Sequence, residues 1–96
     1  MLEIRAMQAE DLEAVVRTES QIFSRPWSRK GFEDALRQKE TIYLVAYEKD
    51  ILAGYCGLLQ SFDEADITNV AVVEKFRKKG VATELLEQLF LRGYER

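Results

Sequence analysis

The chain has 96 residues and a net charge of −3, which limits it to one domain and gives it no general attraction to nucleic acids or anionic membranes. It contains no histidine, so Ser-His-Asp and Cys-His nucleophile pairs and most zinc sites are excluded, and we expect no bound metal. Its single cysteine, Cys56, excludes an internal disulfide, and no apolar run reaches the roughly 18 residues of a membrane span. We therefore expect a cytoplasmic globular protein that spans residues 1–96.

The first part of the chain predicts one strand and two helices. Apolar Leu2, Ile4 and Ala6 alternate with charged residues, which is typical of a short strand. Residues 8–23 place their apolar side chains on one helical face and carry acidic residues near the N-terminal end. Ser28 is positioned to cap a second, shorter helix.

Three strands should follow, because the next apolar runs are rich in β-branched and aromatic residues. Gly54 and Gly57 lie inside the longest run, which indicates close packing or a bulge. The three runs cover residues 41–48, 51–62 and 66–73.

A final helix is predicted from about Gly80, with Gly93 at the position of a C-terminal helix cap. The expected order is therefore β-α-α-β-β-β-α. Helices on a mostly antiparallel sheet give an α+β fold, within the broad α/β class.

Residues 69–83 carry the clearest chemical signal, because a strand leads through a basic loop into a helix that starts at a glycine. A helix N-terminus offers unpaired N–H groups and a partial positive charge, which suit a phosphate. Gly80 would let such a group approach the backbone, and Arg77 could add a bidentate contact. A solvated basic loop that binds nothing remains the alternative.

This segment resembles the GNAT (Gcn5-related) N-acetyltransferases. Residues 77–82 (RKKGVA) match the family signature Q/R-x-x-G-x-G/A. Residues 23–28 (FSRPWS) are similar to the Pro-Trp-Ser loop of RimI-like ribosomal-protein alanine N-acetyltransferases, and residues 63–72 (DEADITNVAV) to their acidic turn and strand. The order of elements matches the N-terminal portion of the family's domain.

The resemblance implies that acetyl-CoA is the co-substrate. Its acetyl-pantetheine arm would lie beside the third strand like an added strand, and a backbone amide there would polarise the thioester carbonyl. The turn and first helical residues would hold the pyrophosphate through their amides. The cofactor-binding residues expected from the resemblance are Val70, Ala71, Val72, Arg77, Lys78, Lys79, Gly80, Val81, Ala82 and Thr83.

The resemblance also implies a groove for the N-terminus of a ribosomal protein. Phe23 and Trp27 could wall this groove, although for Trp27 a hydrophobic clamp that joins the two helices is favoured. Glu64 and Asp66 could attract the α-ammonium group, with a solvated turn as the alternative. We expect Cys56 to be a small buried apolar residue, and because no basic neighbour in the sequence would lower the pKa of its thiol, we expect no covalent mechanism.

The resemblance further implies that a complete family member has a C-terminal β-α-β-β part, which supplies the acid and the base of the reaction. This part is missing from the present sequence. We therefore assign no catalytic residue and expect a GNAT domain truncated at its C-terminus. Two alternatives to N-terminal protein acetylation stay open. One is a non-catalytic half-domain that binds coenzyme A or forms a homodimer through an open sheet edge, and the other is acetylation of a small-molecule amine.

Overall fold

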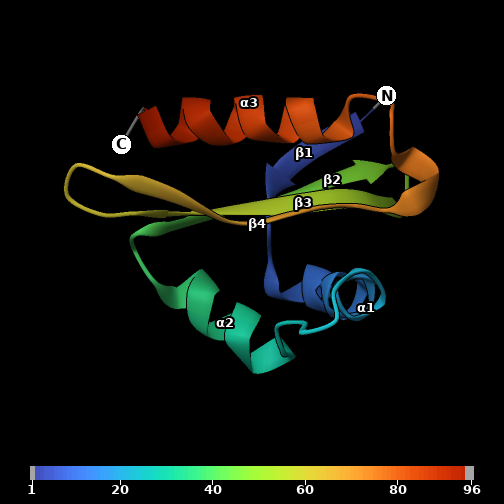
Figure 1. The fold of residues 1–96 in the computed structure, drawn as a ribbon, viewed down its shortest axis with the longest axis horizontal. Coiled ribbons are helices and arrows are strands. Elements are labelled where there is room, and N and C mark those ends of the chain that lie inside the picture. The colour runs from blue at the N-terminus through green and yellow to red at the C-terminus, as the bar shows by residue number, and fades with distance from the viewer. Residues whose placement is uncertain (1, 95–96) are drawn as a thin grey trace.

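The computed structural model describes residues 2–94, and its elements follow the predicted order (Figure 1). The elements are β1 (Leu2–Ala6), the 3₁₀ turn η1 (Ala9–Asp11), α1 (Leu12–Ile22), α2 (Arg29–Arg37), β2 (Thr41–Glu48), β3 (Ile51–Gln60), β4 (Ala65–Val72), the 3₁₀ turn η2 (Glu74–Phe76) and α3 (Val81–Tyr94).

The four strands form one antiparallel sheet in the order β1-β2-β3-β4. Helices α1 and α2 cover one face of this sheet, and α3 lies along the other (Figure 1). The predicted α+β class is therefore confirmed. Because β1 and β4 are the outer strands, β4 presents an edge that no other strand among residues 2–94 pairs with.

Each face of the sheet has its own apolar core, which explains why β2 and β3 are apolar at nearly every position. Toward α1 and α2, Val45 and Tyr55 pack with Phe32. Toward α3, Leu44 packs with Leu85. The site described below lies where β4 meets this second core.

The predicted cap of the second helix is confirmed, because Ser28 Oγ accepts a hydrogen bond from the Gly31 amide at 3.1 Å. The first predicted helix begins instead as a 3₁₀ turn, and Phe23 lies just beyond its end with extended backbone.

The glycines of β3 pack closely, as predicted. A Cβ at Gly54 would come within 2.6 Å of the Ala71 carbonyl oxygen, and one at Gly57 would overlap the ring of Tyr43. The predicted helix cap at Gly93 is wrong, because Gly93 lies inside α3. A Cβ at that position would come within 3.2 Å of Leu58, so the glycine allows α3 to approach β3.

Candidate functional site

The open edge of β4 exposes the backbone groups of alternate residues. Val73 donates its N–H to the Ala53 carbonyl at 2.8 Å, so Val73 and, two residues earlier, Ala71 face β3. Antiparallel alternation then directs the N–H and C=O groups of Val70 and Val72 away from β3. The expected cofactor contact at this strand therefore rests on Val70 and Val72, with Ala71 between them turned toward β3.

Arg77 confirms the outward direction of the Val72 carbonyl. Its Nε donates to the Val72 oxygen at 3.1 Å, across the corner between β4 and the following turn. This bond ties the start of the basic segment to the open edge. The side chains of Val70 and Val72 pack against the core under α3. Because the Val72 carbonyl already accepts from Arg77, the groups left for a ligand are the N–H groups of both residues and the Val70 carbonyl.

A bulge lies just before this edge. Gly57 pairs with Asn69 and Leu58 with Ile67, so Thr68 is an extra residue in β4. The Tyr43 hydroxyl lies 2.8 Å from Thr68 Oγ1 and donates to Asn69 Oδ1 at 3.2 Å. The buried tyrosine thereby fixes the strand immediately before Val70.

The turn before α3 has the backbone geometry of an anion-binding nest. Lys78 and Gly80 have positive φ angles of 65° and 81°, whereas Lys79 between them does not. Alternation of this kind directs successive N–H groups into one concavity. No atom would lie within 4 Å of a Cβ at Gly80, so the conformation of the turn rather than crowding favours glycine there.

A pocket of about 400 Å³ opens beside this turn. The first helical hydrogen bond runs from the Glu84 amide to the Gly80 carbonyl at 3.0 Å, so the amides of the first turn of α3 have no helical partner. The pocket is lined by Val72, Phe76, Arg77, Lys78, Gly80, Val81, Ala82 and Thr83. Seven of the ten residues expected to bind the cofactor are therefore brought to one concavity.

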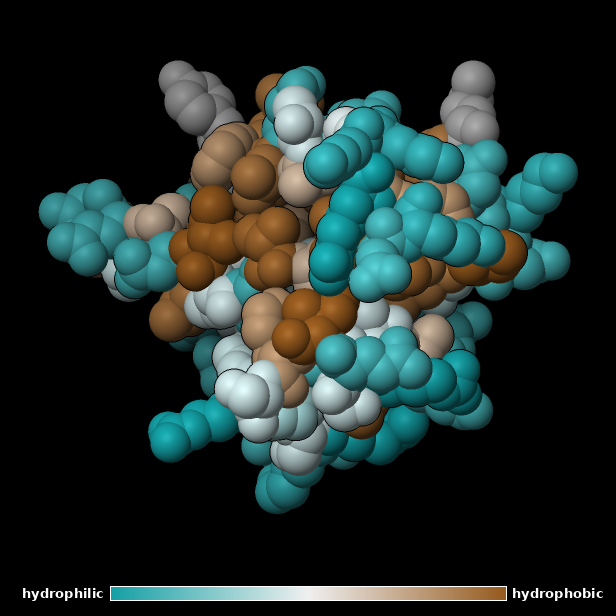
Figure 2. Space-filling model, turned by 45° about the vertical axis from the view of Figure 1, so that its right-hand side comes forward, coloured by the Kyte–Doolittle hydropathy of each residue, from teal (hydrophilic) through white to brown (hydrophobic). Residues whose placement is uncertain are grey.

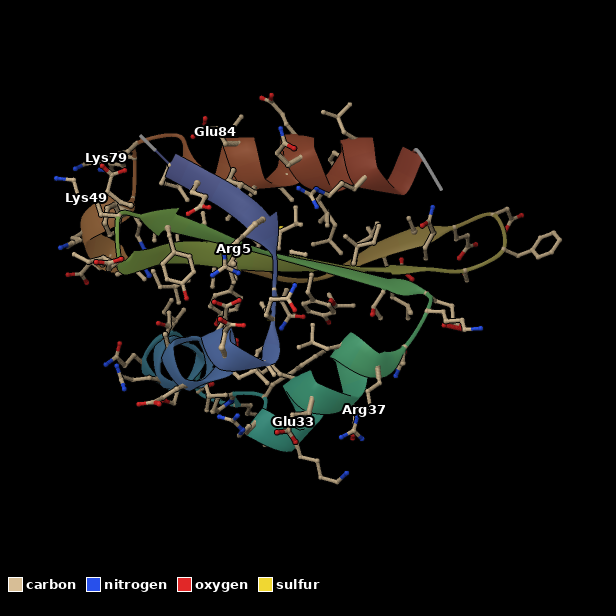
Figure 3. All side chains as sticks on the ribbon, turned by 180° about the vertical axis from the view of Figure 1, so that it is seen from behind. Arg5, Glu33, Arg37, Lys49, Lys79 and Glu84 are labelled. Atoms are coloured by element: carbon tan, nitrogen blue, oxygen red, sulfur yellow. The ribbon has the colours of Figure 1, made fainter. Side chains whose placement is uncertain are left out.

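Positive charge surrounds the pocket. Lys75, Arg77, Lys78 and Lys79 are all exposed, and none of them takes part in the ion pairs found among residues 2–94. Lys79 lies at the N-terminal end of α3, at the same end of the molecule as Lys49 in the β2–β3 turn (Figure 3). Unpaired cations at a helix N-terminus favour a multiply charged anion.

The concavity fits the diphosphate of a coenzyme. It combines the free helical amides, the nest at residues 78–80 and open space above Gly80. The edge of β4 leads away from it, as a strand-like pantetheine arm requires. Figure 2, turned so that the η2 end comes forward, shows apolar side chains gathered beside hydrophilic ones on this face.

The residues expected to contact a peptide lie outside this pocket. Trp27 packs against Phe32 of α2, with ring centroids 5.2 Å apart, and against Tyr43 of β2 at 6.3 Å, so its ring lies between α2 and the sheet. Phe23 is 37% exposed in the loop between α1 and α2. Glu64 and Asp66 are exposed near the β3–β4 turn. Their roles toward a substrate stay predictions.

Cys56 is fully buried in the core under α3, as expected. Burial raises the pKa of its thiol to about 12, so the thiolate needed for nucleophilic chemistry does not form near neutral pH.

Two buried carboxylates were missed by the sequence analysis. Asp11 accepts two hydrogen bonds from Arg5 at 2.8 Å and one from the Tyr47 hydroxyl at 2.9 Å. Glu19 is 2% exposed and accepts from the Tyr55 hydroxyl at 2.6 Å. The signal for Glu19 was its position, four residues after Val15 on the apolar stripe of α1.

Among residues 2–94, no group of three or more potential ligand side chains could hold a metal ion. No helix in this part of the chain has the length and apolar character needed to cross a membrane.

Comparisons with known proteins identify the family of the chain. The sequence model of the Acetyltransferase (GNAT) family matches residues 8–95. A protein of Bacillus subtilis (strain 168), named "putative ribosomal protein bS18-alanine N-acetyltransferase", is 34% identical over 83 residues, which cover 85% of this chain and 55% of that protein. The chain thus spans about half the length of this relative.

Solved structures share the fold. The ribosomal-protein-S18-alanine N-acetyltransferase from Escherichia coli matches with a TM-score of 0.82 and 26% identity over 93% of this chain and 57% of that chain. Ard1 from Thermoplasma volcanium matches with a TM-score of 0.86 over 98% of this chain and 64% of that chain. At 22% identity it is evidence for the fold alone.

Proposed function

The chain belongs to the acetyltransferase (GNAT) family, and from that premise we propose that it takes part in acetyl transfer from acetyl-CoA to the N-terminal α-amine of a ribosomal protein in the cytoplasm. The described residues would form the cofactor-binding part of one GNAT domain. The observation that supports the proposal is that the open edge of β4, with the outward N–H groups of Val70 and Val72, lies next to the nest at residues 78–80.

The co-substrate supplies the activated acetyl group, and the chain binds and orients it. The nest and the first-turn amides of α3 would hold the diphosphate, with Arg77 and Lys79 adding positive charge. The outward amides of Val70 and Val72 would fix the arm, and one of them would donate to the thioester carbonyl oxygen.

Acetyl transfer forms an amide bond to the amine nitrogen and breaks the carbon–sulfur bond. The uncharged amine gives up one proton to solvent as the amide forms, and the departing thiolate takes up one proton from solvent, so no proton is gained or lost overall. An α-amine has a pKa of about 7.7–8.0, so part of it is uncharged near neutral pH, and we assign no base among the described residues. The choice of a ribosomal protein beginning with alanine is supported by the two relatives with 34% and 26% identity.

A peptide beginning with alanine tests this function. Incubation with acetyl-CoA should release free coenzyme A and add one acetyl group to the peptide, whereas the same peptide with a blocked N-terminus should do neither. Transfer to a small polyamine but not to the peptide would favour the small-molecule alternative. Folded protein that transfers no acetyl group to either acceptor would refute the proposal.

The basic turn is tested separately by binding. The variant Lys79→Glu should weaken acetyl-CoA binding measured by calorimetry, and Arg77→Glu with Lys79→Glu should weaken it further. Lys49→Glu is the matched control, because it makes the same charge change at the same end of the molecule, in the β2–β3 turn rather than in the turn before α3 (Figure 3). Equal affinities for Lys79→Glu and Lys49→Glu would remove the basic turn from the site.

The open edge favours one second candidate, a homodimer formed through β4. Exposed backbone groups of an edge strand pair readily with a second strand, and Ile67 of β4 is 42% exposed. Since Val70 and Val72 cannot serve both partners, acetyl-CoA should dissociate such a dimer. Sedimentation with and without acetyl-CoA measures this, and a monomer at all concentrations would exclude it.

A further inference from the structure

Glu19 holds both ends of the loop between α1 and α2. Its backbone carbonyl accepts from the Phe23 amide at 3.0 Å, which closes the last turn of α1. Its side-chain Oε2 accepts from the Trp27 amide at 3.0 Å. One residue therefore fixes residue 23, where the chain leaves the helix, and residue 27, where the chain reaches the aromatic core.

The same carboxylate is anchored to the sheet. Its Oε1 accepts from the Tyr55 hydroxyl at 2.6 Å, and Tyr55 is fully buried in the middle of β3. The Tyr55 ring contacts Phe32 edge-on, with centroids 6.1 Å apart. Burial, and after it the neighbouring Glu19, raises the pKa of the Tyr55 phenol, so the hydroxyl remains a donor across the accessible pH range.

Stability alone does not account for a carboxylate at this position. Removing an ionised group from water costs free energy that hydrogen bonds only offset, and an apolar residue at a core position avoids that cost. A carboxylate that accepts one hydrogen bond on each oxygen fixes the direction and distance of two donors at once, which an apolar side chain cannot do. The arrangement thus specifies a loop conformation relative to the sheet.

The loop conformation bears on the site through a short series of contacts. Trp27 packs against Tyr43, and the Tyr43 hydroxyl contacts Thr68 and Asn69 in the bulge immediately before Val70. The position of the loop that carries Phe23 and Trp27 is therefore linked, through these contacts, to the position of β4, beside which the acetyl group would lie.

We propose that Glu19 is a positioning residue, which sets loop 23–27 against β3 and β4 and thereby shapes the wall that receives the acceptor peptide. This inference deepens the proposed function and rests on it for the identity of the acceptor. Glu19 acts through Trp27 and the loop rather than by touching the reacting atoms.

Trp27 provides a direct readout, because it is the chain's single tryptophan. The variant Glu19→Ala should shift its fluorescence to longer wavelength and increase quenching by acrylamide, at a temperature well below the melting point of the variant. Glu19→Gln keeps the size and one acceptor oxygen, so it should restore much of the wild-type spectrum. Glu13→Gln, on the exposed side of α1, is the matched control and should change nothing.

The kinetic readout separates positioning from a general loss of structure. We expect Glu19→Ala to raise the KM for the peptide about tenfold, the effect of losing a hydrogen bond to a charged group, while its acetyl-CoA affinity stays within about twofold of wild type. Tyr55→Phe, which removes only the anchor to β3, should give a smaller change of the same kind.

The outcomes distinguish the two proposals. An unchanged tryptophan spectrum in Glu19→Ala would overturn the positioning role, and so would a changed spectrum with an unchanged peptide KM. If the wild-type protein binds acetyl-CoA but transfers no acetyl group, the proposed function and the role of loop 23–27 toward the peptide are both refuted. The fluorescence of Trp27 in Glu19→Ala would still show whether Glu19 holds the loop in place.

Discussion

Replacing Gly80 tests the phosphate-binding turn most directly. A Cβ at this position would meet no atom within 4 Å, so Gly80→Ala introduces no clash. The substitution should instead destabilise the fold by roughly 1–2 kcal/mol, because residue 80 has a φ of 81° that is unfavourable for an L-residue. For a domain of this size such a loss lowers the melting temperature by about 4–8 °C per kcal/mol.

The variant Gly80→Asn separates the effect of backbone strain on stability from the effect of an added side chain on ligand binding. Because asparagine adopts positive φ more readily than alanine, Gly80→Asn should keep most of the wild-type stability. Both variants place a side chain where the diphosphate would approach, so both should bind acetyl-CoA about tenfold more weakly or worse. Denaturant unfolding measures the stability and calorimetry the affinity.

Gly31→Ala is the matched control for this pair of variants. Gly31 lies in α2, where a Cβ would meet ordinary contacts of 3.6 Å or more, and alanine should stabilise the helix by up to about 1 kcal/mol. Its acetyl-CoA affinity should equal that of wild type. An unchanged affinity in Gly80→Asn would refute the close approach of a phosphate to this turn, and unchanged stability in Gly80→Ala would refute the backbone argument.

Three further predictions concern the framework of the site. Gly57→Ala should destabilise the fold by about 1–3 kcal/mol, because its Cβ would overlap the Tyr43 ring; a melting temperature equal to that of wild type would contradict this packing. The Cys56 thiol should resist alkylation at pH 8 in the native protein and react after unfolding, since it is buried and its pKa is raised to about 12; rapid native labelling followed by mass spectrometry would show otherwise. Burial alone would raise the pKa of Asp11, but hydrogen bonds from Arg5 and its neighbours outweigh burial and hold that pKa below its usual value. The stability it contributes should be full above the unfolded pKa of about 3.9 and fall as the pH drops through the folded pKa, so Asp11→Asn should show a flatter acid limb in unfolding experiments.

The sequence alone determined the order and type of the helices and strands and the position of the glycine-containing turn before α3. Thr41–Glu48 is a strand as predicted, and Ser28 caps α2. These features depend on side-chain periodicity and on single residues such as Gly80, whose preferences act over a few neighbouring positions. Features that depend on such local preferences can be predicted from the sequence.

Only the tertiary structure decided which groups face the ligand. The outward direction of Val70 and Val72 depends on the register of β4 against β3, and the bulge that precedes them depends on a tyrosine 25 residues away. The pair Glu19 and Tyr55 is separated by 36 residues, and the space that Gly93 leaves in α3 is taken up by Leu58 of β3. Such relations arise from packing between distant segments, which residue preferences and spacing do not encode.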